Sequence, residues 1–108
     1  MPAPDRNYVL FKLRPGVPDY EGPKSLDGRR YRAHIRYIGD TWYLDLASST
    51  GLLAVRGVAL LPGKELLGSY GYSNVLGELW LVDTTGAGEN PNYEEMGSRW
   101  ELRYYPIG

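Results

Sequence analysis

The chain has 108 residues, a formal net charge of −1 at pH 7 and no cysteine. Its length fits one compact domain, and the near-zero charge gives no general attraction to nucleic acid or to an anionic membrane. The lack of cysteine excludes disulfides, thiolate zinc sites and thiol catalysis. Fourteen glycines, eight prolines and ten tyrosines are typical of strands and turns rather than of long helices.

The N-terminal residues carry two prolines and no periodic pattern. We therefore expect a flexible arm over residues 1–7 and a single β domain over residues 8–108. The arm lacks the basic start and apolar stretch of a signal peptide. No apolar run in the sequence approaches the roughly 20 residues that a membrane-spanning helix needs.

Two strands are predicted in the first quarter of the chain. Residues 8–13 form a short run that ends at Arg14-Pro15-Gly16, and residues 19–26 form a longer one. Gly22-Pro23 interrupts the longer run, and because proline cannot donate to a sheet ladder, the pair indicates an edge strand or a bulge. Asp27-Gly28 is typical of a tight hairpin turn leading into the next strand.

The residues around Gly39-Asp40 carry the clearest pattern in the chain. Apolar and charged residues alternate on both sides of this pair, along strands predicted at 29–38 and 41–47. A two-residue turn at Gly39-Asp40 puts every apolar residue of both strands on one face. The register then sets Tyr37 opposite Trp42, Ile35 opposite Leu44, Ala33 opposite Leu46 and His34 opposite Asp45. This pattern predicts a half-buried antiparallel hairpin whose register is strongly specified.

Three further strands are predicted at 52–61, 78–82 and 99–105. The first is apolar on both faces except at Arg56 and Gly57, which predicts either cover on both sides or a bend at Gly57. Single helical turns are expected within 64–70 and 92–96, and a polar, glycine-rich loop over 83–92. About seven short strands separated by turns predict an all-β fold, either a small antiparallel sandwich or a partly open barrel.

The sequence argues against an enzyme. His34 is the one histidine, so no pair of histidines stands at metal-site spacing. A hydrolase built on His34 and Asp45 would need a nucleophile, and no serine stands in a G-x-S-x-G elbow. Residues 86–88 resemble part of a phosphate loop without its lysine, and the oxygen-rich residues of 83–95 do not follow EF-hand spacing. We expect no catalytic residue, no metal site and no cofactor.

The sharpest polar feature is a basic stripe on one face of the strand at 29–38. It consists of Arg30, Arg32, His34 and Arg36. Three interpretations stay open: a face paired across strands, with Asp45, Glu78 and Glu101 as partners; a surface that docks onto an acidic protein; and a groove for single-stranded nucleic acid, with Tyr43 for stacking. We rank them in that order, with nucleic acid least favoured.

Tyr70 and Tyr72 are the aromatic residues best suited to exposed contacts, because the glycine-rich segment 68–77 has no core periodicity. All three tryptophans stand in apolar strand patterns and are expected in the core. An exposed platform of Tyr70 and Tyr72 would serve the alternative function, a β-sandwich binding module for a carbohydrate or a cell-surface ligand.

The order of the segments resembles a known family. The series runs from Leu26-Asp27-Gly28 and the alternating strand after it to Trp42-Tyr43-Leu44-Asp45-Leu46, Gly51, 58–67 (VALLPGKELL), 77–83 (GELWLVD), Met96-Gly97-Ser98-Arg99 and a closing aromatic strand. In this order, over roughly residues 9–105, it resembles the baseplate plug-like protein family of contractile-tailed phages, the cyanophage-type plug. Two places depart from the family pattern. The turn at 38–40 is shorter than its asparagine-containing counterpart, and 68–75 is less basic.

The resemblance implies a non-enzymatic structural protein that packs at the central hub and tube of the tail baseplate as a plug. The implied partners are the baseplate hub, tail tube and spike proteins, with neither membrane nor nucleic acid. The implied location is the virion tail baseplate, after assembly in the host bacterial cytoplasm. We expect the basic stripe and the 68–77 loop, with Tyr70 and Tyr72, to be docking surfaces. We also expect neighbours to cap the edge strand at Gly22-Pro23 by β-augmentation.

Overall fold

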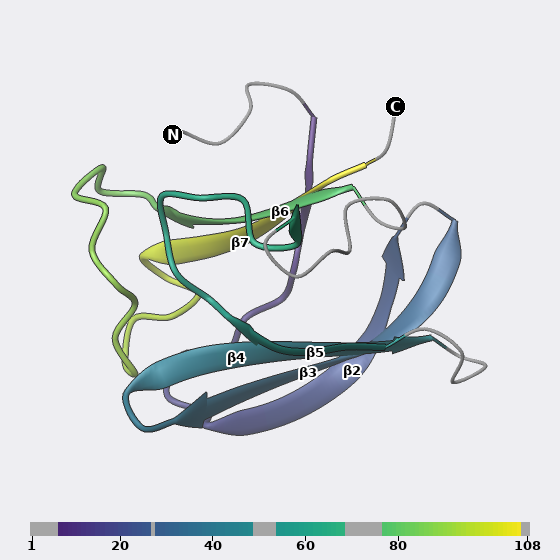
Figure 1. The fold of residues 1–108 in the computed structure, drawn as a ribbon. Helices are drawn as coiled ribbons and strands as arrows, with labels where there is room; N and C mark the ends of the chain where they lie inside the picture. Colours follow the sequence, from purple (N-terminus) through teal and green to yellow (C-terminus); the bar gives the residue numbers. More distant parts are fainter. Residues whose placement is uncertain (1–6, 27, 49–53, 69–76, 107–108) are drawn as a thin grey trace.

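The computed structural model consists of two β-sheets stacked face to face (Figure 1). It describes residues 7–26, 28–48, 54–68 and 77–106. These residues form the strands β1 (Val9–Leu10), β2 (Asp19–Leu26), β3 (Arg29–Ile38), β4 (Thr41–Ser48), β5 (Ala54–Ala59), β6 (Glu78–Asp83) and β7 (Trp100–Tyr105), and no α-helix. The upper sheet has the order β1-β7-β6 and the lower sheet β2-β3-β4-β5. The predicted all-β sandwich is confirmed, and the sheets do not close into a barrel.

The central hairpin has the register that the alternation predicts. Tyr37 lies opposite Trp42, Ile35 opposite Leu44, Ala33 opposite Leu46 and His34 opposite Asp45. Gly39 and Asp40 have φ angles of 56° and 69°, the pair of positive values that a type I′ turn requires. Asp40 tolerates this backbone because its short polar side chain suits the left-handed region. Every predicted apolar position of β3 and β4 faces the core. Tyr37 is partly buried and packs against the core cluster.

The predicted bend at Gly57 is also confirmed. The pairing of β4 with β5 shifts register beside Asp45, and Gly57 has a φ of 64°. The Asp45 carboxylate accepts a hydrogen bond from the Gly57 N–H at 2.7 Å, which holds the bulge in place. Val55 and Val58 are three positions apart, yet both are fully buried. A regular strand would send them to opposite faces, so the bulge explains the apolar residues on both parities.

The first strand is shorter than predicted. β1 covers only Val9–Leu10, because the chain then leaves the upper sheet and crosses toward the lower one (Figure 1). Phe11 still donates its N–H to the carbonyl of Leu102 at 3.0 Å. Of the Asp27-Gly28 turn, Gly28 has a φ of 77° and Asp27 lies outside the described residues.

The helical turn predicted at 64–70 is described only as far as Gly68, where bends lead into a 3-10 residue, and this segment lies along the edge of β6. Pro62 bridges to Leu81, and the Leu66 N–H donates to the carbonyl of Leu79 at 2.8 Å. The Glu65 carboxylate accepts hydrogen bonds from the N–H groups of Leu67 and Leu79, each at 2.8 Å. The segment therefore covers the edge of the upper sheet that β6 would otherwise expose.

The other three sheet edges carry different obstacles to strand addition. β1 is two residues long, and the Lys24 ammonium donates to the carbonyl of Leu10 beside it. β2 is an edge strand, as Gly22-Pro23 predicts, and it presents Pro23 outward and Lys24 inward. The bulge at Gly57 interrupts β5. Because proline, an inward charge and a bulge all oppose strand pairing, these edges do not favour the β-augmentation expected at Gly22-Pro23.

The core lies between the two sheets and is rich in aromatic residues. Trp42 and Trp100 are buried at 0% and 1% exposure, and their indole N–H groups donate to the carbonyls of Asn92 (3.1 Å) and Glu89 (2.9 Å). Trp80 is the exception among the predicted core tryptophans. It is buried, but it stands on the parity opposite to the core-facing leucines of β6 and lies outside the core cluster.

Candidate docking surfaces

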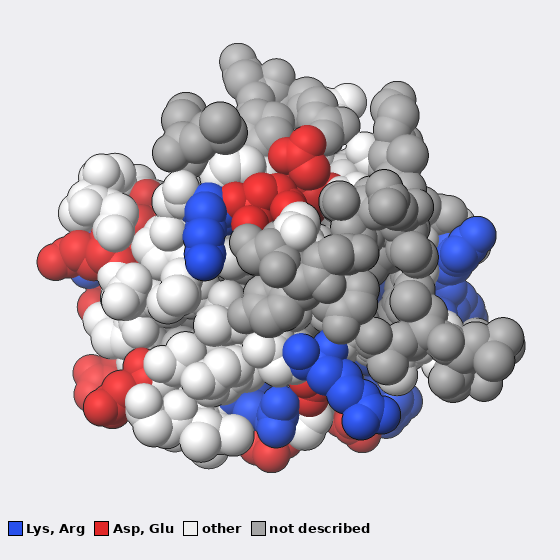
Figure 2. Space-filling view, viewed as in Figure 1, with Lys and Arg blue, Asp and Glu red and all other residues white. Residues whose placement is uncertain are grey.

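The basic stripe runs along β3 on the outer face of the lower sheet. Arg30 and Arg32 are exposed, whereas His34 and Arg36 are partly buried. Arg32 Nε lies 3.1 Å from Glu21 of β2. Figure 2 shows the consequence for the visible side of the lower sheet, where blue cations and red carboxylates lie next to one another. The stripe is therefore not a purely positive surface.

His34 lies beside carboxylates from both neighbouring strands, and Arg36 beside one of them. The Nε2 atom of His34 lies 2.6 Å from Asp19 of β2, and its Nδ1 atom lies 3.8 Å from Asp45 of β4. The guanidinium of Arg36 lies 3.1 Å from the same Asp45. Asp45 thus contacts Arg36, His34 and the Gly57 N–H, so it is committed to the sheet itself.

Two of the three partners predicted for the stripe are wrong. Glu101 contacts Arg103 at 2.7 Å, and Glu78 accepts a hydrogen bond from the Trp80 indole at 2.9 Å. Both glutamates belong to the upper sheet, a whole layer away from β3. The acids that pair with the stripe from β2 could be found only once the register of the first hairpin was known.

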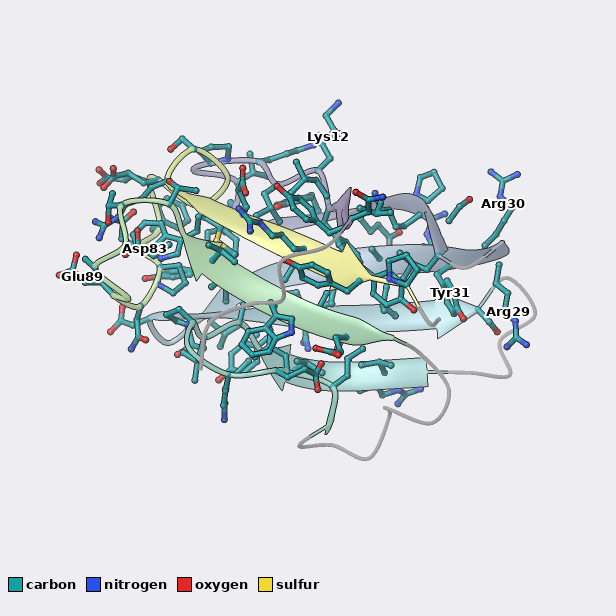
Figure 3. The ribbon with its side chains drawn as sticks, turned by 90° about the horizontal axis from the view of Figure 1, so that it is seen from above. Lys12, Arg29, Arg30, Tyr31, Asp83 and Glu89 are labelled. Atoms are coloured by element: carbon teal, nitrogen blue, oxygen red, sulfur yellow. The ribbon has the colours of Figure 1, made fainter. Side chains whose placement is uncertain are left out.

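The start of β3, at Arg29 and Arg30, differs from the middle of the stripe. Arg29 and Arg30 are exposed, and no residue in the described ranges forms an ion pair or hydrogen bond with either guanidinium. Figure 3 places them at the opposite end of the molecule from Asp83 and Glu89. Among the described residues, the cations without an acidic partner on β3 are therefore those next to the β2–β3 turn.

A shallow depression of about 420 Å³ lies on the same outer face. The stripe residues Arg32, His34 and Arg36 line it together with Asp45 and with Arg56 of β5. Arg56 is exposed and has no charged partner in the part of the chain that the structure describes. Tyr70 and Tyr72 lie outside the described residues.

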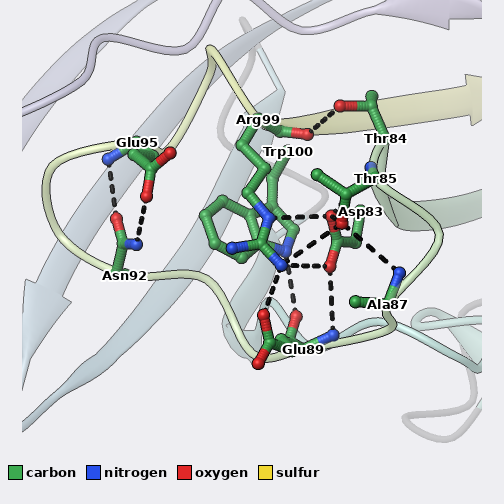
Figure 4. A network of polar contacts seen from close by, with 9 residues as sticks. All are labelled: Asp83, Thr84, Thr85, Ala87, Glu89, Asn92, Glu95, Arg99 and Trp100. Carbon is green, nitrogen blue, oxygen red and sulfur yellow. Dashed lines mark hydrogen bonds and ion pairs between the residues drawn. The ribbon is translucent and has the colours of Figure 1, made fainter.

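Sequence reasoning missed the most connected polar group of the upper sheet, Asp83 at the end of β6 (Figure 4). Its side chain is 1% exposed and meets Arg99 through two hydrogen bonds of 3.0 and 2.9 Å. It also accepts hydrogen bonds from the N–H and hydroxyl of Thr85 and from the N–H of Glu89. The signal in the sequence is the run Asp83-Thr84-Thr85-Gly86, in which an aspartate closes a turn on its own backbone.

Arg99 completes this network. It pairs with Glu89 as well as Asp83, and its guanidinium lies 4.4 Å from the ring centre of Trp100. The hydrogen bonds from Arg99 hold the pKa of the Asp83 carboxyl well below its usual range, although burial opposes this. The same contacts, led by Asp83, raise the pKa of Arg99 above its usual value. The network is a fixed ion cluster that ties the 83–99 loop to the sheet.

Within the described ranges, no group of three or more histidine, cysteine or acidic residues is arranged to hold a metal ion. No helix there is long and apolar enough to cross a membrane.

The chain was compared with known proteins. A protein-family model described as "Cyanophage baseplate Pam3 plug gp18" matches residues 10–106. No curated protein matches the chain significantly. The matched range contains β2 to β7 in full, so it includes the whole lower sheet and two strands of the upper sheet. The chain belongs to the family of the cyanophage baseplate plug.

Proposed function

We propose that this chain is a non-enzymatic structural component of a contractile phage tail baseplate, where it packs at the central hub and tube as a plug. The family match over residues 10–106 carries this proposal. Its direct partners are then the hub, tail tube and spike proteins. The protein assembles in the host bacterial cytoplasm and ends in the virion tail.

The use of the polar groups supports a structural rather than a catalytic role. The Asp83 carboxylate is satisfied by Arg99 and by loop groups, and Asp45 is satisfied by the bulge and the stripe. In the described ranges, the recorded polar contacts of His34 are with carboxylates, and none is with a hydroxyl that it could activate. Such arrangements stabilise a rigid body that neighbours can pack against.

We further propose that Arg30, Arg32, His34 and Arg36, with Tyr70 and Tyr72, form a partner-docking surface. The support is that Arg29, Arg30 and Arg56 have no acidic partner among the described residues, together with the shallow depression that Arg56 and the stripe line. The ion pairs inside the stripe hold Arg32 and Arg36 in fixed positions. An acidic neighbour therefore meets cations that are already ordered, which lowers the entropy cost of docking.

Quantitative mass spectrometry on purified tails, washed in high salt, tests the baseplate role. The expected result is this protein at a fixed, low copy number relative to the spike protein. A structural part withstands the wash because burial of apolar surface, unlike exposed charge pairing, is not weakened by salt. Absence from intact tails would overturn the structural proposal.

A further inference from the structure

A cleft of about 310 Å³ opens on one side of the sandwich, between β2 and the segment that follows β1. Phe11, Ala33 and Ile35, with exposures of 5%, 9% and 2%, belong to both the core and the lining of this cleft. The segment after β1 crosses from the upper to the lower layer at this side (Figure 1). The cleft therefore reaches apolar core surface from the outside.

Two small residues create the hollow. Gly22 of β2 lies directly opposite Ala33 of β3 in the register, and alternate burial along β2 puts Gly22 on the inward face. A Cβ atom added at Gly22 would meet no atom within 4 Å. The flanking inward residues, Tyr20 and Lys24, line the same cleft. The hollow is thus built into two paired strands rather than into a loop.

The rim carries three cations, Lys12, Arg14 and Lys24. In the part of the chain that the structure describes, none of them pairs with a carboxylate, in contrast to Arg32 and Arg36 of the stripe. Arg14 lies 5.7 Å from the ring centre of Tyr20, and Lys24 lies 5.3 Å from that of Phe11. Arg14 and Lys24 are thus held over aromatic rings, and no carboxylate in the described ranges neutralises either charge.

Glu21 also lines the cleft, but its carboxylate lies 3.1 Å from Arg32 on the outer face of the sheet. Burial lowers the pKa of Lys24, because its ammonium lies over an apolar floor and no carboxylate in the described residues pairs with it. An apolar floor under an unpaired cationic rim is complementary to a ligand with an apolar part and a negative charge.

We propose that this edge cleft, lined by Phe11, Gly22 and Ala33 and rimmed by Lys12, Arg14 and Lys24, receives a segment of a partner protein in which a carboxylate stands beside an apolar side chain. The apolar side chain fills the hollow over Gly22 while the carboxylate pairs with the rim. The volume lies at the lower limit for ligand sites and suits one or two side chains. This inference rests on the proposed function and names the chemistry of one baseplate neighbour.

The first test is a ¹H–¹⁵N titration of the full chain with an acetylated six-residue peptide of alternating leucine and glutamate. A peptide with glutamine in place of glutamate is the control. The amides of Phe11, Gly22 and Ala33 are expected to shift, with binding of the glutamine peptide about fivefold weaker, as for loss of a few exposed charge pairs. No shift at these amides, or equal binding of both peptides, would overturn the proposal. Shifts there with an oligo-dT strand but not with the glutamate peptide would also overturn it.

Two pairs of variants locate the binding. Gly22→Leu fills the hollow, whereas Ser25→Leu adds the same side chain to the outward face of the same strand. Lys12→Glu reverses a rim charge, whereas Lys64→Glu reverses an exposed lysine outside the cleft lining. Peptide binding should be lost in Gly22→Leu, fall about fivefold in Lys12→Glu, and stay unchanged in the two controls. Circular dichroism checks that each variant is folded.

Incorporation into tails then separates this inference from the proposed function. If wild-type protein is present in tails and folded Gly22→Leu is excluded while Ser25→Leu is retained, the edge cleft is a docking site. If Gly22→Leu is incorporated at the wild-type copy number, the cleft inference fails and the baseplate role stands. If the wild-type protein itself is absent from tails, the baseplate role fails, and the cleft inference fails with it.

Discussion

The Asp83 carboxylate binds the 83–99 loop to the end of β6. It accepts five hydrogen bonds, from Thr85, Glu89 and Arg99. Two of these donors are loop N–H groups, of Thr85 and Glu89, so loss of the carboxylate charge disturbs more than one ion pair.

Replacing Asp83 with asparagine should lower stability at neutral pH and flatten its pH dependence. The pKa of Asp83 lies below its unfolded value near 3.8, so the carboxylate stabilises the fold above that value, and its contribution is lost as the pH falls toward the folded pKa. The thermal unfolding temperature of the wild-type protein should therefore fall as the pH is lowered from about 5 to about 2, and that of D83N should fall less steeply with pH. Glu94→Gln, at an exposed residue of the same loop, is the control. Parallel curves for D83N and wild type would contradict this account.

Single residues differ in how far the sequence predicts their partners. The pairing of His34 with Asp45 was predictable, because a two-residue turn and a strict alternation leave one register. The contact of Asp83 with Arg99 spans a long loop whose path depends on tertiary packing, so no local pattern specifies it. The same holds for Glu65, whose carboxylate caps the N–H of Leu79 across the edge of the upper sheet.

The bulge in β5 lets apolar residues at both even and odd positions of the strand face the same core. Val55 and Val58 both face inward only because Gly57 adopts a positive φ between them. Any other residue at this position would meet the steric cost of the left-handed region. The bulge also interrupts the regular hydrogen-bonding pattern of an edge strand, so one glycine contributes both to packing and to protection of the edge.

Gly57→Ala should destabilise the protein by about 1–2 kcal/mol, the cost of left-handed backbone for a residue with a Cβ atom. Gly22→Ala is the matched control on the opposite edge strand. The φ angle of Gly22 is not positive, and there is open space where a Cβ atom would be added. Gly22→Ala should change the free energy of unfolding by no more than about 0.5 kcal/mol. Urea denaturation followed by tryptophan fluorescence measures both values. Equal effects of the two substitutions would show that backbone strain at Gly57 is unimportant.

Most strands could be predicted because their signals are local. The bounds of β2 and β3 match the prediction, since turn residues and alternation mark both ends of each strand. The early end of β1 and the path of 62–67 along β6 were not predicted. Both depend on tertiary packing: β1 ends because the chain crosses to the lower layer, and 62–67 lies beside β6 through the contacts of Pro62 with Leu81 and of Leu66 with Leu79.

The molecule as a whole is a sandwich with obstructed edges and two differently charged surfaces. Carboxylates neutralise the middle of the stripe on β3, whereas among the described residues no carboxylate pairs with Arg30 or with the three rim cations of the edge cleft. The fold class was predictable from composition and strand spacing. The docking surfaces were predictable only in part, because a list of arginines does not reveal which of them a neighbouring strand neutralises.

Reversing the charge at the β2–β3 turn should weaken incorporation into the baseplate. The double variant Arg29→Glu/Arg30→Glu replaces two positive charges with two negative ones at an exposed end, without breaking a contact in the described structure. We expect about tenfold less protein in tails assembled at low salt, and a smaller deficit at high salt, because exposed charges are screened. Lys64→Glu is the control, and the readout is copy number by mass spectrometry. Unchanged copy number at low salt would remove the turn from the docking surface.

Arg29 and Arg30 lie at the opposite end of the molecule from Asp83 and Glu89 (Figure 3), whose carboxylates are paired with Arg99. The longest dimension of the molecule is 35 Å, whereas charges in physiological salt are felt over only about 8 Å. A charged neighbour therefore interacts electrostatically with only one end of the molecule at a time, before any atoms touch. We therefore expect the Arg29 and Arg30 end to bias the orientation in which an acidic neighbour approaches, before contacts form.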